Sequence, residues 1–108
     1  MVKIREYDII NADSLIIRLN EIENMGQSIN IKLALERVLS EYTNINNFYI
    51  DLEKVNYADS SFLGGLLSIN TKCIKENKNF YIFNLTERVY DIYQTASLNK
   101  ILDIKNPQ

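Results

Sequence analysis

The chain has 108 residues, of which 46% are hydrophobic and 24% charged, so we expect one domain with a single core over residues 1–108. Its formal net charge of −2 excludes a general attraction to nucleic acid or anionic membranes, and no apolar run approaches the roughly 20 residues of a membrane span. With one cysteine and no histidine, the chain has no internal disulfide and no zinc site of known spacing. We therefore expect a cytoplasmic protein without signal peptide, metal or cofactor, and catalysis has little support.

A hairpin is predicted at the start of the chain. Residues 2–10 alternate loosely between apolar and polar side chains, which is typical of an edge strand. Residues 11–14 are turn formers, and the short apolar run over residues 15–19 reads as a second strand. We expect the two strands to pair antiparallel.

An amphipathic helix is predicted next, after a mostly polar connection over residues 20–27. Ser28 is a plausible N-cap, and the helix is expected to reach about residue 42. Its apolar side chains recur at helical spacing. They are Ile31, Leu35, Val38, Leu39 and Tyr42.

Two further strands are rich in β-formers. Residues 48–52 are predicted to form a central strand, and residues 80–85 are almost continuously apolar, as in a strand covered on both faces. Between them, a helix begins near Ser60 and carries two apolar stripes. The stripes are Phe62, Leu66, Ile69 and Cys73, and Leu63, Leu67 and Ile74.

The end of the chain predicts a short helix capped by Thr86 and, over residues 100–104, a last strand or helical turn. The resulting order is β-β-α-β-α-β-α-β. Strand–helix–strand units give parallel pairing. We therefore predict an α/β fold: a single-layer mixed sheet, mostly parallel after an N-terminal antiparallel hairpin, with helices packed on it.

The joint between residues 48–57 and the following helix is the first candidate site. Asp59 and Ser60 are residue types that cap helices, and capping alone explains them. A hydroxyl at a helix N-terminus is also where an anion is best stabilised, so a phosphate there would change the surface without melting the helix. Both interpretations stay open at this stage.

Other chemistry-bearing residues have structural interpretations. Cys73 lies on an apolar stripe, away from the neighbouring lysines, and is predicted to be a buried structural thiol. Glu21 and Glu23 would suit acid–base work only with a further pocket residue, and otherwise are solvated loop acids.

The sequence resembles the STAS domains, in particular the bacterial anti-sigma factor antagonists, over nearly its whole length. That family has a D-S-S-G-L-G-type motif after a central strand of the form hhhDLsxV, which residues 48–55 match. Residues 80–85 and 86–96 are similar to its later strand and helix. The motif matches Asp59, Ser60, Ser61, Phe62, Leu63 and Gly64.

Three positions depart from the family pattern. The loop that often reads G-E-L-D contains Glu21 and Glu23, Phe62 replaces a motif glycine, and Ser97 stands where a glycine usually precedes the last strand. A large ring at position 62 would either block a kinase or anchor a different partner.

The resemblance implies a non-enzymatic partner switch. Ser60 would be the phosphoacceptor, and Asp59, Ser61, Phe62, Glu21 and Glu23 would surround it in a partner-binding surface. The implied partners are an anti-sigma factor that is also a serine kinase, and a serine phosphatase. The alternative is a structural or sensory STAS module without phosphorylation, in a stress-signalling complex or a lipid-transport system, and a small enzyme ranks third.

Overall fold

One mixed sheet forms the frame of the protein. The computed structural model describes residues 4–21 and 31–107, whose strands form a five-stranded sheet in the order β1-β2-β3-β4-β5. The first pair is antiparallel and every later pair is parallel, which confirms the predicted fold class. The strands are β1 (Ile4–Asn11), β2 (Ser14–Leu19), β3 (Asn47–Asp51), β4 (Asn79–Phe83) and β5 (Asp103–Ile104).

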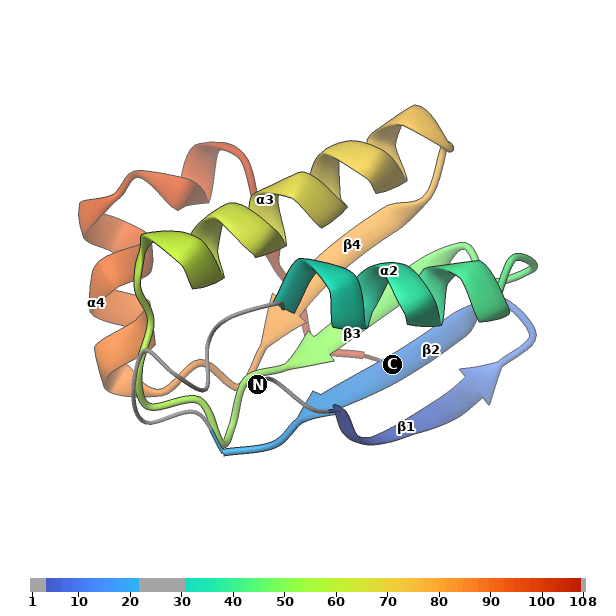
Figure 1. Cartoon of the computed structure of the whole chain (residues 1–108), viewed down its shortest axis with the longest axis horizontal. Coiled ribbons are helices and arrows are strands. Elements are labelled where there is room, and N and C mark those ends of the chain that lie inside the picture. The colour runs from blue at the N-terminus through green and yellow to red at the C-terminus, as the bar shows by residue number, and fades with distance from the viewer. Residues whose placement is uncertain (1–3, 22–30, 108) are drawn as a thin grey trace.

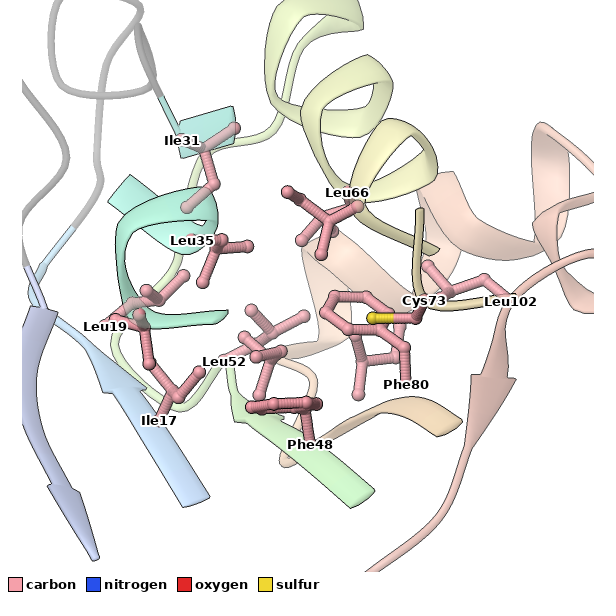
Figure 2. Packing of buried hydrophobic residues seen from close by; sticks show 14 of the residues in the cluster. Ile17, Leu19, Ile31, Leu35, Phe48, Leu52, Leu66, Cys73, Phe80 and Leu102 are labelled. Atoms are coloured by element: carbon pink, nitrogen blue, oxygen red, sulfur yellow. The ribbon is translucent and has the colours of Figure 1, made fainter. Parts of the chain in front are cut away.

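The helices share one core on one face of this sheet. Figure 1 shows α2 (Ile31–Glu41) and α3 (Ser60–Lys75) side by side over the strands, with α4 (Glu87–Thr95) beside the start of α3. Apolar side chains from all three helices join the inward residues of β2, β3 and β4 in a single cluster. Figure 2 shows part of it, with Leu35 of α2 and Leu66 of α3 above Phe48 of β3. Each helix therefore forms because its apolar stripe is covered by this sheet face.

The opposite sheet face carries a smaller cluster. Ile16, Tyr49 and Phe83 are buried there, and the rings of Tyr49 and Tyr81 stack with centroids 5.1 Å apart. Side chains of β4 alternate between this cluster and the helix-covered core, which contains Phe80. The nearly continuous apolar run of β4 was thus correctly predicted to be buried on both faces, although the described helices cover only one of them.

The C-terminal end of the chain also follows the predicted order of elements. The predicted last element divides into a 3-10 turn, η1 (Leu98–Lys100), and β5. Before η1, Ser97 has a φ of 57° in the left-handed region, which explains why a glycine would suit this position. The predicted cap Ser28, the start of the first predicted strand and Glu23 lie outside the described residues.

Candidate functional site

The carboxyl ends of three parallel strands are joined by a buried carboxylate. Asp51, which is only 4% exposed, pairs with Arg18 at an Nε–Oδ2 distance of 3.5 Å. Its Oδ1 atom accepts hydrogen bonds from the backbone N–H of Glu53 at 2.9 Å and from the side chain of Asn84 at 3.3 Å. The network fixes where the chain leaves β3 toward α3. Sequence reasoning did not assign this role, although an acid at the end of an apolar strand is the signal that could have found it.

A second contact holds the same loop against α4. The hydroxyl of Thr86 donates to the carbonyl oxygen of Val55 at 2.8 Å and accepts from the backbone N–H of Val89 at 3.3 Å. Thr86 is therefore the predicted cap of α4, and it is also a tie to the loop before Ser60, which the sequence did not predict. Val55 itself is fully buried. The backbone that leads to Ser60 is thus anchored at two points.

Asp59, and not Ser60, caps α3. The Asp59 side chain accepts from the backbone N–H of Phe62 at 2.8 Å, and the residue has extended backbone angles. Ser60 is the first residue of the helix, and both Ser60 and Ser61 are exposed. Since the cap is supplied by its neighbour, the Ser60 hydroxyl lies at the positive end of the α3 dipole without a capping role.

Phe62 belongs to the core. Its side chain is 0% exposed and lies in the same cluster as Leu66, on the stripe of α3 that faces the sheet. The expectation that this ring is a partner contact, or an obstacle beside Ser60, is therefore wrong. A helix turns by about 100° per residue, so the side chain two positions after Ser60 points to the opposite side.

Two neighbouring glycines set the surface next to Ser60. A Cβ atom added to Gly65 would overlap the Cγ2 methyl group of Ile31, so this glycine lets α2 and α3 pack closely. A Cβ atom added to Gly64 would meet nothing within 4 Å. Gly64 is exposed and lies on the same side of α3 as Ser61, three residues away.

Of the remaining predicted residues, one is exposed to solvent and one is buried. Glu21 is exposed at the end of the described segment after β2. Cys73 is buried, and burial foremost, with the Glu76 carboxylate second, raises the pKa of its thiol to about 11. The thiol is therefore protonated at neutral pH, as expected for a structural cysteine. Among the described residues, no three His, Cys, Asp or Glu side chains gather as a metal site, and no helix is long and apolar enough to span a membrane.

A family model that covers nearly the whole chain assigns the protein to its family. The STAS domain model matches residues 4–107. The chain belongs to the STAS family. No curated protein sequence matches the chain.

Several solved structures share this fold. The anti-sigma factor antagonist SpoIIAA in its unphosphorylated form superposes with a TM-score of 0.71 at 14% identity, covering 94% of this chain and 87% of that one. Phosphorylated SpoIIAA, a Bacillus cell fate determinant, superposes with a TM-score of 0.66 at 13% identity, covering 94% of this chain and 90% of that one. A proposed anti-sigma factor antagonist from Thermotoga maritima, TM1081, superposes with a TM-score of 0.76 at 19% identity, covering 94% of this chain and 86% of that one.

Proposed function

We propose that this STAS domain is an anti-sigma factor antagonist that works by partner switching, with Ser60 as its phosphoacceptor. In the unphosphorylated state it binds an anti-sigma factor that is also a serine kinase, and phosphorylation releases that partner. A serine phosphatase then restores the hydroxyl, so the protein itself binds and does not catalyse. The switch operates in the cytoplasm, where these partners act.

The exposed Ser60 hydroxyl on an anchored helix start is the observation that carries the proposal. Asp59 supplies the cap, and the Asp51 network fixes the preceding loop, so a modified Ser60 leaves both intact. The likeness to an anti-sigma factor antagonist known in unphosphorylated and phosphorylated forms supports the same role.

Electrostatics explain how the modification would release a partner. A phosphoserine carries about −1.5 to −2 charges, which the N-terminus of α3 tolerates. The same charge lies next to the Asp59 carboxylate, in the centre of a surface that we assign to Asp59, Ser60, Ser61, Glu21 and Glu23. Any acidic or apolar partner surface placed there would be repelled or would have to desolvate a dianion. About 1.4 kcal/mol suffices for a tenfold loss of affinity.

The alternative role, a STAS module without phosphorylation, drew its support from Phe62. Because that side chain is 0% exposed, it neither obstructs Ser60 nor offers an anchor for another partner. No other observation on the described residues favours the alternative.

Phosphopeptide mapping tests the assignment directly. The protein and its Ser60→Ala and Ser61→Ala variants are incubated with the anti-sigma factor kinase and ATP. We expect one phosphate on Ser60, unchanged labelling of Ser61→Ala and no labelling of Ser60→Ala. Phosphate on Ser61 alone, or on neither serine, would contradict the proposal.

A further inference from the structure

A groove runs between α2 and α3 from the phosphoacceptor end of α3 toward its C-terminus. It consists of two hollows of about 420 and 320 Å³. Both are lined by Lys32 of α2 and Ser68 of α3, so they adjoin. Ser61 lines the first hollow, and Lys75 lines the second. We call this feature the α2–α3 groove.

The side chains along α3 leave the groove open. Ser61, Gly64 and Ser68 are small and exposed, and a Cβ atom added to Gly64 would meet nothing within 4 Å. On the opposite wall, Leu33 of α2 is 60% exposed. A floor of small residues beside an exposed leucine suits a third helix, whose backbone can approach closely and whose apolar side chains can contact the rim.

The charge of the groove differs from that of the whole chain. Its lining includes three lysines, at positions 32, 72 and 75, and one acid, Glu36, a net charge of +2, whereas the chain carries −2. The Lys72 ammonium is paired with Glu76 at 3.7 Å, but both side chains are about half exposed. Such surface pairs are weak and are exchanged readily for a partner's carboxylate. The groove is therefore complementary to an acidic segment.

We propose that the α2–α3 groove receives an acidic amphipathic helix of the partner, and that the phosphate on Ser60 expels this helix. The proposal rests on the function proposed above and adds the chemistry of the partner. Ser60 precedes Ser61, which lines the groove, so a dianion there lies at the groove's end. It repels an acidic segment that the lysines attract, and release on phosphorylation follows.

Charge reversal in the groove tests the proposal with the partner. We expect Lys32→Glu combined with Lys75→Glu to weaken binding of the anti-sigma factor kinase by roughly tenfold or more, with the effect smaller at high salt. Lys100→Glu combined with Lys105→Glu makes the same change in charge at two exposed lysines that line neither hollow, and this matched control should change affinity less than about twofold. Equal effects of reversals inside and outside the groove would overturn the proposal.

A synthetic peptide separates this proposal from the proposed function. The peptide is an amphipathic helix of 16 residues, the length of α3, with leucine and alanine on one face and glutamate beside it. In a ¹⁵N NMR titration, we expect shift changes at Ser61, Gly64 and Ser68 that a lysine version of the peptide does not cause. These shifts without any kinase binding would contradict only the proposed function; no shifts, with the kinase bound, would contradict only the groove.

A second copy of the chain is the rival occupant. Sedimentation equilibrium of the unmodified protein and of Gly64→Leu distinguishes a second copy of the chain from a partner helix as the occupant of the groove. We expect a monomer in both cases. A dimer that Gly64→Leu abolishes would assign the groove to self-association and overturn the proposal.

Discussion

The two sides of α3 show how one helix serves both stability and recognition. The side toward the sheet holds Phe62, Leu66 and Ile69, all at most 2% exposed. The solvent-facing side, which borders the α2–α3 groove, holds Ser61 and Gly64, which are exposed. The first side is buried in the core, whereas the second carries small, exposed residues next to Ser60. The same two turns therefore tolerate substitution very differently, and three substitutions measure that difference.

Phe62→Ala should have the largest effect. Removing a fully buried ring leaves a cavity in the core, so we expect a loss of about 3–5 kcal/mol in the free energy of unfolding. Urea denaturation measures it. A loss below about 1 kcal/mol would show that the ring is not packed as described.

Gly65→Ala should have an intermediate effect. The added methyl group overlaps the Ile31 side chain, and overpacking of this kind costs about 1–3 kcal/mol. The better helix propensity of alanine returns up to about 1 kcal/mol. We expect a net loss of about 1–2 kcal/mol by thermal or urea unfolding, and Ile31→Ala in the same chain should relieve part of the clash. A stabilised Gly65→Ala would contradict the close packing of α2 on α3.

Gly64→Ala should have the smallest effect and the opposite sign. Its methyl group enters open space, so only the helix propensity changes, and we expect a gain of up to about 1 kcal/mol. The paired measurement on adjacent glycines is its own control, because both substitutions make the same chemical change in the same helix. Equal losses at both positions would remove the distinction between the two sides of α3.

Much of this arrangement was predictable from periodicity. The spacing of the apolar residues in α2 and of the stripe containing Phe62 and Cys73 gave the buried faces, because helical repeats are local properties of the sequence. The nearly continuous apolar run of β4 likewise indicated a strand buried on both faces, because such a run is also a local property of the sequence. Position 62 was assigned both ways: its spacing placed it on the core stripe, and the motif placed it on the partner surface. The structure supports the assignment from spacing, because the Phe62 side chain is buried in the core.

Other features depend on contacts between distant segments and carry no local pattern. Thr86 was predicted as a cap, but its hydrogen bond to Val55 joins residues 31 apart. The roles of Gly64 and Gly65 differ only because Ile31 packs against one of them. The choice of Asp59 over Ser60 as the cap likewise depends on backbone angles that either residue type can adopt.

The affinity of the anti-sigma factor kinase for the protein before and after phosphorylation on Ser60 tests the central claim most directly. Isothermal titration calorimetry with the unmodified and the stoichiometrically phosphorylated protein gives both dissociation constants, while circular dichroism confirms that each is folded. The account predicts at least a roughly tenfold weaker complex after phosphorylation, equivalent to about 1.4 kcal/mol. Equal affinities for two folded forms would contradict it.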